Sequence, residues 1–277
     1  MAENTKIGWA HHTLNPWQGC SKVSLGCKYC YAEGQDVRFS LGRHWGPRAA
    51  RLFANDVYMA KPLAWNRKAE RAGERRRVFC MSMGDFFELH EDPPIVARQC
   101  LYRHRVFEMI GKTPWLDWLL LTKRPENVQG MVPDSRWRER FPSNVWLGVS
   151  IENQDAAEAR LPILLDLDEQ FCGVRPFLSC EPLLGPLDLA AAAPSYMLPM
   201  ILHWVIVGSE SGSRARPAQL DWFRSLRDQC KRMGVPYFFK QWLEPGTRAK
   251  VELPVLDGRQ WADIPPTCAA VASGGVS

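Results

Sequence analysis

Three cysteines, Cys20, Cys27 and Cys30, lie close together near the start of the chain, in the sequence NPWQGCSKVSLGCKYCYAE. Three thiolates on one loop can hold a metal centre and leave one coordination position open, as catalytic metal sites do. The next cysteine, Cys80, lies inside an apolar run, so the short interval typical of a zinc ribbon is missing. Catalytic zinc usually draws on histidine or carboxylate ligands, so three cysteines fit a [4Fe–4S] cluster better. We therefore expect these three residues to bind such a cluster.

A second set of candidate residues directly follows short apolar runs spread along the chain. If the runs are parallel strands, their carboxyl ends meet at one edge of the sheet and these side chains share one site. Asp85, Asn153 and Ser211 are suited either to this site or to capping the next helix. The residues that cap helices poorly, and for which we predict catalytic roles, are Lys123, Glu181, Glu210 and Lys240.

The apolar runs predict the strands that position these residues. Each run is rich in Val, Ile, Leu and aromatic residues and shows no polar alternation, which is typical of strands buried on both faces of a parallel sheet. The predicted strands are Val78–Met83, Trp118–Leu121, Val145–Val149, Pro176–Cys180, Trp204–Val207 and Tyr237–Phe239, with one more ahead of the cysteine loop.

Segments with helical character lie between these runs. They are Ile95–Ile110, Gln154–Leu165, which Pro162 interrupts, and Asp221–Met233, with Asp221 at its N-cap. Repetition of strand, polar loop and helix indicates βα units. We therefore predict an α/β protein with a single domain, a full or partial (βα) barrel of parallel strands. A doubly wound open sheet is the alternative.

We expect the barrel domain to span residues 1–250 and the cysteine loop to span residues 15–33. Residues 251–277 are rich in Pro, Gly, Ala and Ser, which predicts an irregular tail with its last ten residues disordered. The basic run Arg67–Arg77 is either a solvated helix face or a patch that contacts phosphate. His11 and His12 could supply a fourth metal ligand, although a surface or pocket role is simpler.

The composition excludes several classes of protein. The nine cysteines are odd in number and not spaced as a secreted disulfide framework, and the best apolar stretch, LPMILHWVIVG, is too short for a membrane span. The N-terminus lacks the pattern of a signal peptide, so we expect a cytoplasmic protein without membrane contact. The net charge of +5 permits a nucleic-acid partner. The oligomeric state stays open. The simplest interpretation of the remaining cysteines is core packing for Cys80, Cys100, Cys172, Cys180 and Cys230.

Several motifs recur in one order along the chain from Thr5 to Trp242. They are IGWAHHTLNPWQGCSKVSLGCKYCYAE, SMGDFF, LLLTKRPE, NVWLGVSIENQ, FLSCEPLLGPLDL, WVIVGSESG with RARP, and VPYFFKQW. In these motifs the chain resembles the phage- and bacterium-borne three-cysteine-motif proteins, often labelled phage-protein-like. Many members read IEWTDATWNP at the start, from which Gly8, His11 and His12 depart.

The cysteine loop also resembles that of the radical S-adenosylmethionine (SAM) enzymes. Their usual spacing is C-x3-C-x2-C; the second interval here matches it, and the first is three residues longer. The resemblance implies a radical SAM-like barrel, reductive cleavage of SAM, and an electron donor of the flavodoxin or ferredoxin type. By strand order it implies these SAM contacts: Ser82 and Asp85 to the methionyl amine, Ser150, Glu152 and Asn153 to the ribose, and Gly208, Ser209 and Tyr31 to the adenine. A nucleotide or a nucleic-acid base is the expected substrate.

Two other functions remain open. In the first, Cys20, Cys27 and Cys30 hold structural zinc together with a histidine in a nucleic-acid-binding phage protein that lacks catalysis. In the second, the chain is an iron–sulfur protein that has lost SAM cleavage and acts as a sensor.

Overall fold

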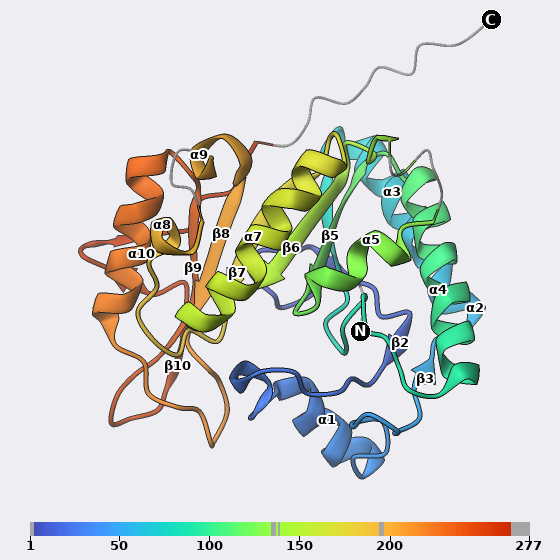
Figure 1. Cartoon of the computed structure of the whole chain (residues 1–277), viewed down its shortest axis with the longest axis horizontal. Coiled ribbons are helices and arrows are strands. Elements are labelled where there is room, and N and C mark those ends of the chain that lie inside the picture. The colour runs from blue at the N-terminus through green and yellow to red at the C-terminus, as the bar shows by residue number, and fades with distance from the viewer. Residues whose placement is uncertain (1–2, 134–136, 138, 194–196, 267–277) are drawn as a thin grey trace, which may run out of the picture.

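The computed structural model describes residues 3–133, 137, 139–193 and 197–266. Its centre is an eight-stranded sheet in the order β1-β4-β5-β6-β7-β8-β9-β10 (Figure 1). Neighbouring strands from β1 to β9 run parallel, and β10 is antiparallel to β9. The bounds are β1 His12–Thr13, β4 Arg76–Cys80, β5 Leu116–Thr122, β6 Val145–Ser150, β7 Arg175–Cys180, β8 Trp204–Gly208, β9 Tyr237–Leu243 and β10 Lys250–Glu252.

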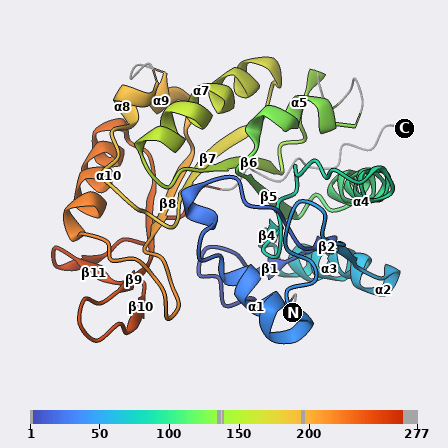
Figure 2. The same ribbon diagram turned by 60° about the horizontal axis from the view of Figure 1, so that its bottom comes forward.

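The sheet is a curled half-barrel (Figure 2). From β4 to β9 each strand lies beside the preceding strand of the sheet, whereas a doubly wound sheet reverses its strand order at a switch point. Within the described residues, β1 at one end and β10 at the other are not paired with each other. The prediction of a partial parallel barrel is therefore confirmed, and the full barrel and the doubly wound sheet are wrong.

The six predicted strands form as β4 to β9 because they are buried on both faces; every residue of β6 and of β8 is buried. The prediction for β9 was too short. This strand continues to Leu243 because β10 pairs with its last three residues. A two-stranded ribbon of β2 (Trp17–Gln18) and β3 (Leu52–Phe53) stands apart from the main sheet.

Helices cover the convex face of the sheet (Figure 1). They are α3 Lys61–Ala72, α4 Pro93–Gly111, α5 Val128–Met131, α7 Gln154–Gln170, α8 Leu189–Ala192, α9 Leu198–Ile201 and α10 Leu220–Met233. Two predictions about them were wrong. Pro162 does not interrupt α7, since buried Leu161, Leu164 and Leu165 fix this helix against the sheet. The N-cap of α10 is Gln219, and Asp221 lies in the first turn, where it pairs with Arg224.

Two apolar layers line the two faces of the sheet. The larger one fills the space between the sheet and the helices. The smaller one occupies the concave face and is largely aromatic: Trp9, Phe79, Leu119, Trp146, Phe177, Trp204, Ile206 and Phe238. Gly148 makes room for it, because a Cβ there would lie 2.3 Å from the ring of Phe177. Trp9 is 4.6 Å from Phe79 of β4 and 6.4 Å from Trp204 of β8 between ring centroids, so the N-terminal segment crosses the concave face. We call this layer the aromatic floor.

The tail is more regular than the sequence predicts. From residue 250 the chain forms β10, β11 (Val255–Leu256) and β12 (Arg259–Gln260). Trp261 is buried, with the guanidinium of Arg259 3.6 Å from its ring centroid, and its carbonyl accepts a hydrogen bond from the amide of Phe239 in β9. The covered edge of β9 thus gives the tail its order. The predicted disorder of the last ten residues lies outside the described residues.

Three of the five cysteines expected in the core are buried, namely Cys80, Cys180 and Cys230. Cys100 and Cys172 are exposed, so core packing is wrong for these two. Cys100 lies on α4, and Cys172 follows the end of α7. No helix in the described ranges is long and apolar enough to cross a membrane.

Candidate functional site at the carboxyl ends of the strands

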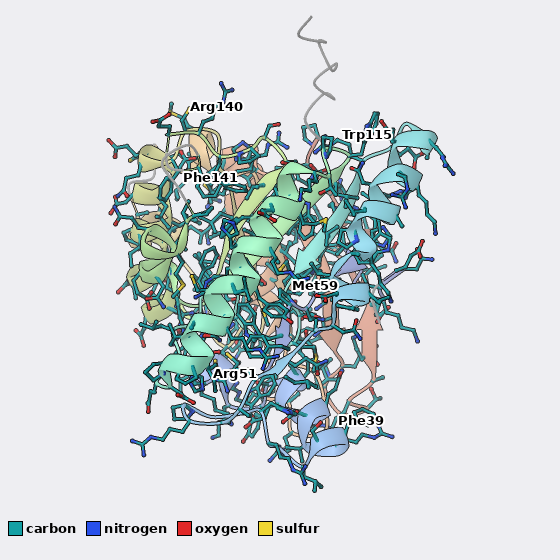
Figure 3. The ribbon with its side chains drawn as sticks, turned by 90° about the vertical axis from the view of Figure 1, so that its right-hand side faces the viewer. Phe39, Arg51, Met59, Trp115, Arg140 and Phe141 are labelled. Carbon is teal, nitrogen blue, oxygen red and sulfur yellow. The ribbon has the colours of Figure 1, made fainter. Side chains whose placement is uncertain are left out.

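A cavity of about 490 Å³ lies at the carboxyl ends of the parallel strands. One side of its lining comes from residues that follow β4 to β9, and the other comes from the cysteine segment and the start of α1 (Tyr31–Ser40). Figure 3 shows Trp115, just ahead of β5, at one end of the molecule and Arg51 and Phe39 toward the other. The strand direction therefore gathers the residues at one mouth.

Cys20, Cys27 and Cys30 all line this cavity, and none of them forms a disulfide. Cys27 ends the short 3-10 helix η1 (Leu25–Cys27), and Cys30 is the N-cap of α1. Gly19, with φ at +111°, allows the chain to turn before Cys20; a Cβ there would lie 2.3 Å from the carbonyl oxygen of His44. The cysteine segment is thus folded tightly enough to turn three thiols toward one space.

Hydrogen-bond donors lie close to the thiols, whereas their burial favours the protonated form. Arg124 Nη1 lies 3.7 Å from Cys20 Sγ, and Ser24 Oγ lies 3.7 Å from Cys27 Sγ. Burial raises the pKa of Cys30, and hydrogen bonds from the amides of Glu33 and Ala32 act against that rise. Burial and the charges of Glu88 and Asp85 raise the pKa of Cys20, and the charge of Arg124 opposes this. A metal centre would displace the thiol protons, and these donors would then face the sulfur atoms.

The donor set therefore fits an iron–sulfur cluster in its chemistry. In the part of the chain that the structure describes, no three His, Cys, Asp or Glu side chains are already arranged around a metal position. The two histidines considered as a fourth ligand do not line the cavity. His12 stacks on Trp65 with ring centroids 4.6 Å apart, and His11 Nδ1 accepts a hydrogen bond from the amide of Arg77. The proposal of a histidine ligand beside the cysteines is not supported by this geometry.

A buried polar network stands behind Cys20. Arg124 donates to Asp85 Oδ2 at 2.9 Å and to the carbonyl oxygen of Ser21 at 2.8 Å. Glu88, which is fully buried, accepts from the amide of Ser21 at 2.9 Å and from two nitrogens of Arg51 at 2.8 and 2.9 Å. Burial would raise the pKa of Glu88, but Arg51 and Arg124 lower it overall, so this carboxylate stays ionised. The network ties the cysteine segment to the ends of β4 and β5.

Asp85 is the centre of this connection. Its Oδ1 accepts from Thr122 Oγ1 at 2.7 Å and from the amide of Phe87 at 3.0 Å. Its Oδ2 accepts from the amide of Lys123 at 3.0 Å and from Arg124. Because both carboxylate oxygens of Asp85 accept hydrogen bonds from the protein, this residue has a structural role here, although it also lines the cavity.

The four residues predicted to be catalytic all line the cavity. Lys240 Nζ lies 2.5 Å from Glu181 Oε1, and both side chains are 18% exposed. Glu210 instead binds the guanidinium of Arg216 through both oxygens, at 2.5 and 2.8 Å, and Arg216 also donates to the carbonyl of Leu25 in the cysteine segment. Glu210 is thus a link between two loops. Lys123 lies close enough to Glu152 to lower the pKa of that carboxyl group, but forms no ion pair within the described ranges.

The residues assigned to a cofactor divide into two groups. Those that line the cavity are Tyr31, Ser82, Asp85, Ser150 and Ser209. Ser209 is 1% exposed, and its Oγ has no hydrogen-bond partner in the described part of the chain. The hydroxyl of Tyr31 donates to the carbonyl of Ser82 at 2.5 Å, and the amide of Ser82 donates to Asn15 at 2.8 Å.

Glu152, Asn153 and Gly208 do not line the cavity. Asn153 caps α7 by accepting from the amide of Ala156, which is the alternative role that its residue type suggests. Glu152 is buried, accepts from Arg160 at 2.8 Å and from the amide of Gly26 at 3.3 Å, and so supports the cysteine segment from behind. Burial would raise the pKa of Glu152, but Lys123 and Arg160 lower it overall.

Sequence reasoning missed several residues of the site. Arg51 and Glu88 are joined across 37 positions, and Arg216 reaches Leu25 across 191. No local pattern marks such pairs. Part of the basic run Arg67–Arg77, in contrast, makes contacts within the protein. Arg75 pairs with Asp117 at 2.7 Å, and Arg77 donates a hydrogen bond to the carbonyl of Trp9.

A comparison with protein-family models matches nearly the whole chain. A family model described as "Protein of unknown function (DUF5131)" matches residues 4–265, and no curated protein matches the chain. Every residue of the site described above lies inside the matched range. The cysteine segment, the half-barrel and its cavity thus belong to one matched unit, and the chain is a member of the DUF5131 family.

Proposed function

We propose that this protein is an iron–sulfur enzyme of the radical SAM type and a divergent relative of that superfamily, carried by phages and bacteria. Cys20, Cys27 and Cys30 would bind a [4Fe–4S] cluster, and the cavity would bind SAM and a nucleotide or nucleic-acid base. The observation that carries the proposal is that three free thiols face one cavity at the carboxyl ends of a partial parallel barrel. Because the thiols must stay reduced, we assign the activity to the cytoplasm.

When bound, the cluster would supply the electron for reductive cleavage of SAM. An electron donor of the flavodoxin or ferredoxin type would then return an electron to the cluster. The chain contributes charge and position. Lys123 and Arg124, consecutive in sequence, offset the negative charge of three thiolates; Arg124 lies 3.7 Å from Cys20 Sγ. Hydrogen bonds to cluster sulfurs also tune the reduction potential. Glu88 and Asp85 keep Arg124 in this position.

The opposite side of the cavity offers groups for the organic ligands. Ser150 and Ser209 line it, and Tyr31 lines the cavity from the side of the cysteine segment. Lys240 Nζ donates a hydrogen bond to Glu181 Oε1 at 2.5 Å, and the proton of this contact is the one that the pair would give to, or take from, a bound molecule. Their 18% exposure limits the access of bulk water to that proton.

One experiment tests the proposal. The chain is purified without oxygen, its iron, sulfide and zinc are measured, and 5′-deoxyadenosine is assayed after addition of reductant and SAM. We expect about four irons per chain with matching sulfide, and cleavage of SAM. Cys27→Ala should lose the cluster, whereas Cys100→Ala, which changes an exposed cysteine on α4, should keep it.

The other outcomes have clear meanings. About one zinc per chain without sulfide contradicts the proposal and supports the zinc-binding, nucleic-acid-binding protein. A cluster that forms and never cleaves SAM contradicts the enzyme and leaves the iron–sulfur sensor.

A further inference from the structure

A group of cations surrounds one aromatic ring at the rim of the cavity. Lys28 Nζ and the guanidinium groups of Arg214 and Arg216 each lie 5.3 Å from the ring centroid of Tyr29. Arg248 joins them through hydrogen bonds to the carbonyls of Ser213 at 2.9 Å and Ala215 at 3.1 Å. We call Lys28, Tyr29, Arg214, Arg216 and Arg248 the Tyr29 patch.

The patch carries excess positive charge. Glu210 neutralises Arg216. In the described part of the chain, no carboxylate forms an ion pair with Lys28, Arg214 or Arg248, and all three side chains are exposed. A single exposed cation is ordinary. Here, cations from the cysteine segment and from the loop after β8 meet around one ring, and Arg248 from the loop after β9 donates to the backbone beside Arg214 and Arg216. This is the pattern of a surface that binds phosphates and stacks on bases.

The patch is continuous with the cavity, because Tyr29 belongs to both. The cavity, at about 490 Å³, is large enough for a drug-sized molecule and too small for stacked base pairs. Ser209 is among the residues that line it, and its Oγ, which has no partner among the described residues, is buried, so a ligand atom reaches this hydroxyl only once the side chain turns toward the cavity. The Tyr29 patch outside the cavity thus favours a polyanion, and the cavity itself favours a single polar ring system. A polynucleotide with one base unstacked combines the two.

We propose that the Tyr29 patch binds the sugar–phosphate backbone of single-stranded nucleic acid, DNA or RNA, and that the cavity receives one of its bases. The substrate is then a base in a polymer rather than a free nucleotide. This inference rests on the proposed function for the chemistry performed on the base. The binding itself needs neither cluster nor SAM.

Fluorescence anisotropy of the full chain with labelled single strands of about 16 nucleotides tests the binding. One arm uses DNA, one RNA, one the matching duplex, and mononucleotides and polyglutamate serve as competitors. We compare the double variant Lys28→Gln/Arg214→Gln with Arg67→Gln/Arg71→Gln, which removes the same charge from exposed positions of α3.

Wild type should bind one or both single strands more tightly than the duplex. The Tyr29-patch double variant should bind at least about tenfold more weakly, and its log–log salt slope should fall by about 0.7 for each phosphate that it no longer neutralises. The α3 variant should match wild type. Tyr29→Leu should weaken binding by roughly fivefold or more, because bases cannot stack on the leucine side chain.

Four results would overturn the inference: no binding of either single strand, equal losses in the two double variants, competition by mononucleotides as strong as by the oligonucleotide, or equal binding of polyglutamate. The last would assign the patch to an acidic protein. The fate of the proposed function is read separately. A chain that binds single strands through the patch but holds no cluster keeps this inference and loses the enzyme, and the reverse result does the opposite.

Discussion

The two sides of the cavity are built differently. On the side of Cys20, Asp85, Glu88 and Arg124 have their polar atoms paired with the protein itself. On the side of β7 to β9, Ser209 has a buried hydroxyl without a partner in the described residues, and Lys240 and Glu181 hold each other in a single contact. The polar groups of the first side hold the chain itself in place. The polar groups of the second side are less fully paired and remain able to bind a ligand. Pairing of polar atoms therefore separates support from binding better than residue type does.

The largest effect should come from breaking the supporting side at Glu88. Glu88→Gln leaves Arg51 without its buried counter-charge, whereas Arg124 keeps Asp85, so the free energy of unfolding should fall by roughly 3–5 kcal/mol. Glu91→Gln, which breaks an exposed pair with Arg48, should change it by about 0.5 kcal/mol or less. Urea denaturation followed by circular dichroism measures both. Equal losses would mean that the supporting network is not special.

On the binding side, Lys240→Met should cost less. Glu181 would lose its partner but can reach water, so we expect the free energy of unfolding to fall by roughly 1–2 kcal/mol. The proposed SAM cleavage should fall strongly in the same variant. Lys112→Met, which removes an exposed partner of Glu108 outside the cavity lining, serves as a control and should leave the activity near wild type. Unchanged activity in the Lys240 variant would remove the pair from the proposed chemistry.

The pH dependence of the free energy of unfolding tests His12, a buried histidine at the edge of the supporting side. Burial lowers the pKa of His12 from 6.5 to about 4, so the folded chain keeps this ring neutral. Below pH 6.5 the unfolded chain binds a proton that the folded chain does not, and stability falls as the pH drops toward about 4. His12→Phe keeps the ring stack on Trp65 and should flatten this dependence.

The control for that measurement is His104→Gln, since His104 is 60% exposed and pairs with Glu108 across one helical turn. It should retain the wild-type dependence between pH 7 and pH 5. A His12 variant that is as acid-sensitive as wild type would show that other groups, such as His11, dominate the titration.

The smallest effects should distinguish the two sides most finely. Ser82→Ala removes a hydroxyl that is bonded to Asn15 and should cost about 1 kcal/mol. Ser209→Ala removes an unpaired buried hydroxyl and should leave stability unchanged or raise it by up to about 1 kcal/mol, while weakening SAM or oligonucleotide binding. Thermal melts and anisotropy measure these. A destabilised Ser209 variant would mean that its hydroxyl already has a structural partner.

The sequence predicted the sheet well because its signal is local. Runs such as Val145–Val149 are buried on both faces, and burial follows directly from composition. The strand ends then place Lys123, Glu181, Glu210 and Lys240 at one cavity without further information. The tail was misjudged because Trp261 gains its order from β9, far away in the sequence.

Roles within the site were harder to predict than membership of it. Asp85 and Glu210 reach the cavity as expected, yet each pairs with an arginine. Arg124 reaches Asp85 only in the folded chain, and Arg216 lies six positions after Glu210, with no local pattern that predicts the pair. Asn153 could equally cap a helix or bind a ligand, and local geometry decided for the cap. The capacity of Ser209 to bind is visible only as a missing partner in the described structure.

The aromatic floor has a kinetic consequence. Because Trp9, Trp146 and Trp204 fill the concave side of the sheet, we expect SAM and the substrate of the proposed enzyme to use the same entrance, at the carboxyl ends of the strands. A single strand of nucleic acid bound to the Tyr29 patch would cover that entrance. Loading of the small molecule would then have to precede docking of the strand, and the strand would have to leave before the next round. Such an enzyme would work distributively, changing one base for each encounter with its polymer.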